Sequence, residues 1–178
     1  HEVDLWNVLR RMLFADGRLA RIGGDTRVRY AYCQEYLLPS LFYAADRLGD
    51  AHAMDLAGKL LQLFDRESEF NGDGTFFGRR LADLREQSPY YYTRLESDRA
   101  CVLGQAIAFA PLTEAPPRPR EDFESSVAGH WVEPEHGAVM HRSRARLASF
   151  AWRAQGLTQG LCLPPDESSL AEWRQNLC

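Results

Sequence analysis

The sequence predicts an α+β fold in which helices come first and strands follow. Apolar residues recur every three to four positions as far as about residue 110, which is the period of a helix with one buried face. After residue 127 large and small side chains alternate with a period of two, which is typical of strands. Four prolines fall within 111–119, and this density is typical of a linker. We therefore expect an α-helical part over 1–110, a proline-rich linker over 111–126 and a β part over 127–178.

Glycine and proline signals divide the helical part into segments. An apolar stripe over 3–15 predicts a first helix, which the dipeptide Asp16-Gly17 ends. A second helix is expected over 27–48, and Pro39 should kink it or divide it in two. Asp50 then caps a third helix over 51–64.

The second half of the helical part starts with the turn Asn71-Gly72-Asp73-Gly74. A short helix is expected over 78–86. Ser88-Pro89 predicts the start of a last helix that continues to about residue 110, because serine is a good cap and proline fits the first helical position. Cys101 lies in an apolar run of this helix, so we expect it to be buried. Successive helices with short connections are expected to form antiparallel hairpins.

The β part contains several short alternating segments. We expect a turn at Glu133-Pro134-Glu135-His136-Gly137 between the first two strands. Ser169 and Glu172 form a capping box that predicts a short helix near the end. The expected strands cover 127–132, 138–141, 147–153 and 161–163.

Composition and charge exclude several classes of function. Hydrophobic residues make up 45% of the chain, which is enough for a core, and the net charge of −4 argues against a nucleic-acid partner. No apolar stretch is long enough to cross a membrane, so we expect a soluble chain without a membrane partner. No Cys-x-x-Cys or Cys/His cluster occurs, and we expect neither a metal nor a cofactor. The parent protein is periplasmic, secreted or cytoplasmic; the sequence does not choose, and it leaves the oligomeric state open.

Charged and aromatic residues gather around a glycine pair at Gly23-Gly24. Free amides at a helix start favour anions, arginines can hold a carboxylate, and tyrosines can stack on sugar rings or transfer protons. The alternative is that Asp25 or Thr26 only caps a helix and the tyrosines pack between helices. The cluster contains Asp25, Arg27, Arg29, Tyr30, Tyr32, Glu35 and Tyr36.

Three histidines occur in the β part. His130 and His136 flank the predicted turn, and His141 lies in a predicted strand beside Arg142. A histidine in a strand is usually half-buried surface. The alternative is that His141 and Arg142 face a cleft between the two parts of the chain, where ligand sites often form.

The order of these features resembles that of the heparinase II/III-like polysaccharide lyases. The text I-G-G-D-T-R-V-R-Y, the helix pairs, the proline-rich joint and the strand text G-A-V-M-H-R-S and L-A-S-F-A-W-R-A carry the resemblance, from about residue 17 to 163. It implies an incomplete α/α toroid of helical hairpins followed by part of an antiparallel β-sandwich. It also implies cleavage of acidic, uronate-containing polysaccharide by β-elimination.

The chain departs from that family in one important respect. Lyases of the family use an Asn-His pair and a tyrosine from earlier hairpins, and this chain has no Asn-His dipeptide. The chain also starts at His1 without a methionine and stops abruptly at Cys178. We therefore expect a fragment across the junction of toroid and sandwich, which lacks part of the catalytic machinery. Whether the chain itself is an enzyme stays open.

The chemistry implied by the resemblance assigns candidate roles to residues near the predicted junction. β-Elimination requires neutralisation of the sugar carboxylate, a base for the α-proton and an acid for the leaving oxygen. Tyr30, Tyr32 and His141 are the catalytic candidates. The substrate-binding candidates are Asp25, Arg27, Arg29 and Arg142.

Two alternatives to a lyase remain. A glycoside hydrolase on a similar helical toroid would need two carboxylates across a cleft, for which Asp25 and Glu35 are the candidates. The other alternative is a carbohydrate-binding or scaffold protein that kept the fold without catalysis.

Overall fold

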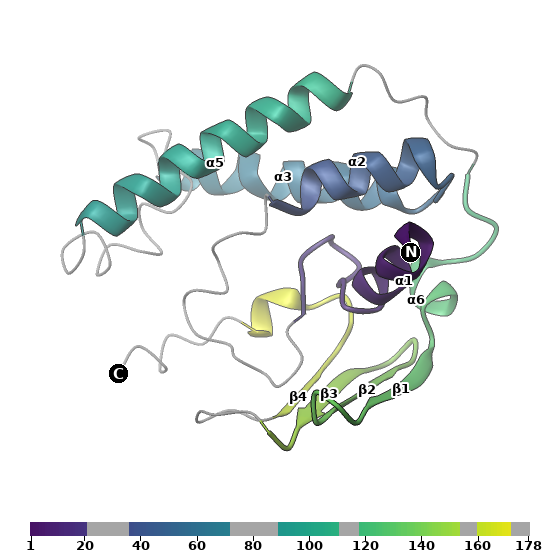
Figure 1. Ribbon diagram of the computed structural model, residues 1–178. Helices are drawn as coiled ribbons and strands as arrows, with labels where there is room; N and C mark the ends of the chain where they lie inside the picture. The colour runs from purple at the N-terminus through teal and green to yellow at the C-terminus, as the bar shows by residue number, and fades with distance from the viewer. Residues whose placement is uncertain (21–35, 72–88, 111–117, 154–159, 172–178) are drawn as a thin grey trace. The chain divides into compact units, whose positions relative to one another are not determined.

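The structure, a computed structural model, has both helices and a four-stranded antiparallel sheet, so the α+β class is confirmed (Figure 1). Its contacts divide the chain into two compact units. The first unit joins His1–Tyr30 to Pro119–Cys178, and the second is Ala31–Arg118. The residues that the structure describes are 1–20, 36–71, 89–110, 118–153 and 160–171.

The second unit is helical. Its described helices are α2 (Leu37–Arg47), α3 (Ala53–Asn71) and α5 (Pro89–Phe109), and α2 packs against both of the others. Helix α5 starts at Pro89, as predicted, and the proposed cap Ser88 lies outside the described residues, whereas α3 continues past the predicted end at residue 64. The buried apolar side chains of α2 and α3 include Leu38, Leu41, Phe42, Leu56 and Leu60.

Pro39 and Cys101 both lie in helices of this unit. Pro39 is the third residue of α2, so it lies in the first helical turn, where a missing amide proton costs no hydrogen bond within the helix. Residues 27–35 lie outside the described residues. Cys101 was expected to be buried, but it is exposed. Helix α5 carries apolar residues on several faces, and among its described side chains only that of Ala106 is buried.

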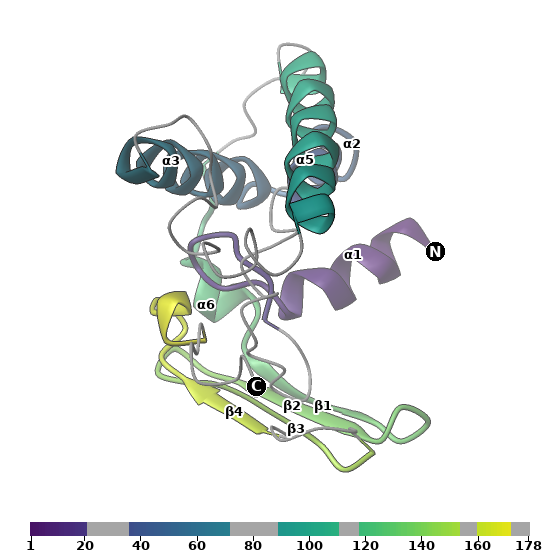
Figure 2. The same ribbon diagram turned by 90° about the vertical axis from the view of Figure 1, so that its left-hand side faces the viewer.

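The first unit contains the sheet, whose strand order β1-β2-β3-β4 follows the sequence (Figure 2). Neighbouring strands are antiparallel, as expected for strands joined by hairpins. The strands are β1 (Gly129–Glu133), β2 (Ala138–Arg142), β3 (Leu147–Ala151) and β4 (Gly160–Leu163). The predicted turn between the first two strands is confirmed, and it ends at Gly137 with a φ of +63°.

The two faces of the sheet differ in burial. Register places Trp131, Met140 and Ser149 side by side on one face, which we call the inner face. Met140 and Ser149 are buried, as are Leu147 and Ala151 beside them. The opposite, outer face carries Val132 and Phe150, which are about half exposed. The alternation read from the sequence is therefore correct for β3, and the small residues rather than the aromatic ones face the core.

The N-terminal segment belongs to the sheet unit. Helix α1 (Glu2–Arg11) is followed by a tight reversal in which Leu13 and Leu19 form an antiparallel bridge around Gly17. The side chains of Phe14 and Ala20 are buried in a cluster with Leu147 of β3. The predicted division assigned 1–110 to one helical part, whereas these contacts join residues 1–20 to the strands.

A short helix, α6 (Phe123–Ser126), occupies the end of the segment expected to be linker, and a 3-10 turn (Ser168–Ala171) follows β4. Within the described ranges, no helix combines the length and apolar composition needed to cross a bilayer.

Candidate functional site

The predicted site residues fall into two groups. Five of them lie outside the described residues, so their part in a site stays a prediction: Asp25, Arg27, Arg29, Tyr30 and Tyr32. The other two, His141 and Arg142, are neighbours on β2 and therefore point to opposite faces of the sheet. The His141 side chain is exposed on the outer face, and the Arg142 side chain is buried under the inner face. Within the sheet unit these two side chains do not line one wall.

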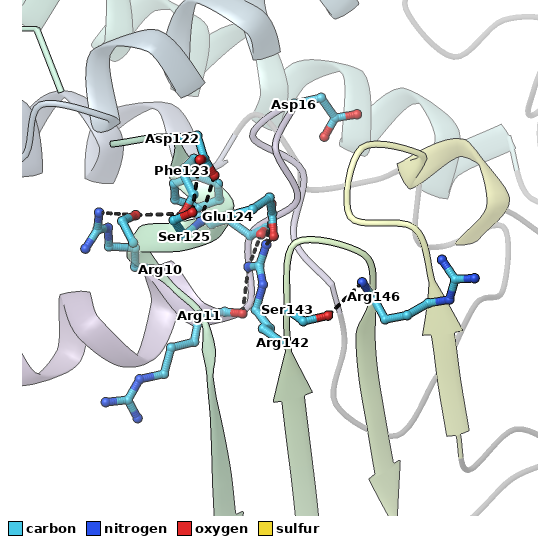
Figure 3. Close-up of polar contacts among 12 residues, drawn as sticks. Arg10, Arg11, Asp16, Asp122, Phe123, Glu124, Ser125, Arg142, Ser143 and Arg146 are labelled. Carbon is cyan, nitrogen blue, oxygen red and sulfur yellow. Dashed lines mark hydrogen bonds and ion pairs between the residues drawn. The ribbon is translucent and has the colours of Figure 1, made fainter. Parts of the chain in front are cut away.

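The guanidinium of Arg142 is held by partners from three segments of the unit (Figure 3). Its Nη2 donates to both carboxylate oxygens of Glu124 at 2.6 Å, and its side chain is 0% exposed. Its Nη1 donates to the carbonyl oxygens of Arg11, at 2.9 Å, and of Leu13. The guanidinium carbon lies 5.4 Å from the ring centre of Phe123. These contacts tie α6 and the end of α1 to β2.

Burial dominates the ionisation of this pair. It raises the pKa of Glu124 above its ordinary value, although the charge and hydrogen bonds of Arg142 act in the opposite direction. It likewise lowers the pKa of Arg142, against the attraction of Glu124. Because Nη2 donates to both oxygens of the Glu124 carboxylate and the arginine still carries its charge at neutral pH, we treat the two as an ion pair.

Helix α6 is held in place by a cap of its own. Asp122 accepts a hydrogen bond from the Ser125 amide at 2.8 Å and another from the Ser125 hydroxyl at 2.9 Å, and it pairs with Arg144. The Ser125 amide first, and then Arg144, lower the pKa of Asp122 to about 2. Cap and ion pair together place Glu124 under Arg142.

A groove of about 570 Å³ lies between α1 and the inner face of the sheet. Its floor is apolar, formed by Met140, Ala138 and Ala151 of the sheet together with Val8 and Met12 from the α1 side. Aromatic and charged side chains complete the lining: Arg11, Trp131, Glu133, His136 and Arg153.

The position of the Trp131 ring in this groove is set by Arg11 and Gly129. The guanidinium carbon of Arg11 lies 4.6 Å from the ring centre, which is a cation–π contact. At Gly129, two residues earlier on the same face, a β-carbon would come within 2.7 Å of the indole ring. The ring therefore lies back along its own strand, and only glycine leaves space for it there.

The Arg153 side chain packs closely over Gly137 in the turn between β1 and β2. Its side-chain carbons lie where a β-carbon of Gly137 would stand, at 2.5 Å from that position, and its Nη1 donates to the Glu135 carbonyl at 2.8 Å. Gly137 serves both the positive φ of the turn and the passage of Arg153.

The groove offers an aromatic ring, two guanidinium groups, one carboxylate and one imidazole around an apolar floor. Such a combination suits a ligand with an apolar face and an anionic group. The sequence pointed only to Glu133 and His136, as turn residues, because the set comes from α1, β1, the turn after β1 and the segment after β3. The usable signals were the glycines two residues before Trp131 and at the end of the turn.

Models of known protein families, curated proteins and solved structures were all compared with the chain, and none of the three comparisons found a match.

Proposed function

We propose that this chain is part of a polysaccharide lyase-like protein that cleaves acidic, uronate-containing polysaccharide by β-elimination. In this proposal the helices belong to an incomplete α/α toroid and the sheet to a β-sandwich. The groove between α1 and the sheet holds one sugar unit of the polymer. The observation that carries the proposal is the presence of Trp131, Arg11 and Arg153 in that one groove.

The groove has the two features that a uronate unit requires. An indole ring provides a flat apolar surface for the hydrophobic face of a pyranose ring. Arg11 and Arg153 supply two positive charges against the single carboxylate of Glu133, so the local field favours an anion although the whole chain is acidic. Neutralising the sugar carboxylate is the first requirement of β-elimination, because it acidifies the α-proton.

Proton transfer in this proposal falls to residues predicted from the sequence. Tyr30 and Tyr32 are the proposed base and acid, with Arg27 and Arg29 as further carboxylate partners and Asp25 as a substrate contact. His141 takes no part at this groove, because its side chain lies on the outer face of the sheet. His136 adds an imidazole at the groove itself. Arg142 has a positioning role in this proposal. Its contacts with Glu124 and with the carbonyls of Arg11 and Leu13 hold the end of α1 beside the groove.

Carbohydrate binding without catalysis is the second candidate. The stacking ring and the arginines are sufficient for binding, and a binding protein needs no base. A glycoside hydrolase is less well supported, because among the described residues that line the groove Glu133 is the one carboxylate, and hydrolysis needs two.

The test is incubation of the full-length protein that contains this chain with a panel of uronate polymers, followed by both ultraviolet absorbance and reducing-end assays. A lyase releases an unsaturated product that absorbs in the ultraviolet. Reducing ends without that absorbance indicate a hydrolase, and binding without either indicates a binding protein. If the chain binds no uronate polymer, the proposal is wrong.

Variants connect the result to the groove. Trp131→Ala and Arg11→Gln should each weaken polymer binding about tenfold, as expected for an aromatic or arginine side chain that the bound ligand covers. Matched controls are Trp152→Ala, which removes a tryptophan that is about half exposed, and Arg146→Gln, which removes an exposed arginine. Equal losses in the variants and the controls would exclude the groove.

A further inference from the structure

We propose that His130 and His141 form a two-histidine binding site for a borderline divalent transition-metal ion such as Zn²⁺ or Ni²⁺. The site lies on the outer face of the sheet, opposite the groove, and the inference does not rest on the proposed carbohydrate function.

Strand register brings the two imidazoles together. His130 of β1 is paired directly with His141 of β2, so both side chains leave the same face of the sheet. The ring centres are 6.2 Å apart and the ring planes are inclined by 49°. Because a metal–nitrogen bond is about 2.0–2.1 Å, two imidazoles at a tetrahedral angle on one ion have ring centres roughly 5–5.5 Å apart. The observed separation exceeds this by roughly 1 Å, which rotation of the two exposed side chains can close.

The surroundings leave the imidazole nitrogens available. Both side chains are exposed, and none of the described residues forms a hydrogen bond or ion pair with either ring. Their neighbours on the same face are Ala148, paired with His141, and Val132, two positions along β1 from His130. These aliphatic side chains cannot compete for the nitrogen lone pairs.

The ligand type decides which ions bind. Imidazole suits zinc, nickel and copper, whereas calcium and magnesium require oxygen ligands. No cluster of three or more histidine, cysteine or carboxylate side chains occurs among the described residues, so the site that they form has two protein ligands, and water completes the coordination. No metal was expected from the sequence, because no ligand cluster is close along the chain, whereas the hairpin brings these two histidines together.

The test is a calorimetric titration of the full chain, made without a polyhistidine tag, with Ni²⁺ and separately with Zn²⁺. The parent and every variant carry His1→Ser, because an N-terminal histidine forms its own chelate between imidazole and amino group. We expect one ion per chain. His130→Gln and His141→Gln should each weaken binding about a hundredfold, since the second ligand acts at a high effective concentration.

His136→Gln is the matched control, because it removes an exposed histidine from the turn of the same hairpin and should leave binding unchanged. Zinc should also raise the melting temperature of the parent but not of the two site variants. An NMR titration of the parent chain is a second, independent test. On addition of zinc, the imidazole proton resonances of two histidines, neither of them His136, should shift together. No binding by the parent, binding that survives either site substitution, or binding lost only with His136→Gln would overturn the proposal.

Discussion

At the scale of single residues, the structure assigns roles that depend on partners far away in the sequence. Arg142 is the clearest case. The predicted strand ended one residue before it, and its partners are Glu124, 18 residues earlier, and main-chain oxygens about 130 residues earlier. A buried charge needs such partners, because leaving water costs free energy that only close hydrogen bonds recover.

We predict that Arg142→Ala is strongly destabilising. The substitution leaves the buried Glu124 carboxylate and two carbonyl oxygens without their donors, and breaking a buried ion pair from one side typically costs about 3–5 kcal/mol. Urea unfolding followed by circular dichroism measures the change in free energy. The double variant Glu124→Leu/Arg142→Met is the control, because it removes both charges and should recover much of the loss. A loss below about 1 kcal/mol for Arg142→Ala would show that the pair is exposed in solution.

A second prediction compares two glycines with the same backbone conformation. Gly137 and Gly49 have φ of +63° and +66°, so alanine is strained at both, by about 1–2 kcal/mol. A β-carbon at Gly49 meets open space, whereas at Gly137 it meets the side chain of Arg153. Gly137→Ala should therefore displace Arg153 and weaken the binding of anionic ligands in the groove, whereas Gly49→Ala should only lower the stability of the fold. Thermal melting and ligand titration of both variants separate the two effects.

At the scale of elements, local signals predicted the type of each helix and strand better than its ends. The start of α5 at Pro89 and the turn between β1 and β2 were predicted correctly because both depend on residues adjacent in sequence. Helix α3 runs further than predicted, and α6 was missed because four residues are too few for a helical period. What makes α6 a helix is its cap at Asp122 and the burial of Phe123.

The cap of α6 makes stability depend on acidity. The pKa of Asp122 is lowered from 3.8 to about 2 in the folded chain, so the unfolded chain binds more protons between these values. The stabilisation is therefore complete above about pH 4 and is lost as the pH falls towards 2. Asp122→Asn should lower the melting temperature at pH 6, and the difference from the parent should vanish as the pH approaches 2. A difference that stays constant over this range would contradict the role of the charge.

At the scale of the whole molecule, contacts group the chain differently from the order of its elements. Residues 1–20 are helical and turn-like, yet Leu13 and Phe14 are fully buried and Phe14 packs with Leu147 of the sheet. The N-terminal segment therefore contributes to the core of the sheet unit, although about 100 residues separate it from the first strand.

This grouping predicts different effects for two leucines of the N-terminal segment. Leu13 is 0% exposed and Leu5 is 70% exposed. Leu13→Ala should cost about 2–5 kcal/mol, as for other buried leucines, and should speed hydrogen exchange in β2 and β3. Leu5→Ala should change stability by less than about 0.5 kcal/mol. If Leu13→Ala left exchange in the strands unchanged, the N-terminal segment would not belong to the sheet unit.

By itself the sequence determined the α+β class, the existence and order of the long helices and of the strands, and the turn between β1 and β2. These features follow from periodicity and from capping or turn residues, which act over a few positions. Only the tertiary structure decided that residues 1–20 join the sheet, that Arg142 is buried while His141 is exposed, and that Trp131, Arg11 and Arg153 share one groove. These outcomes depend on strand register and on contacts between segments that are distant in the chain. A local sequence pattern does not predict which surfaces pack against each other.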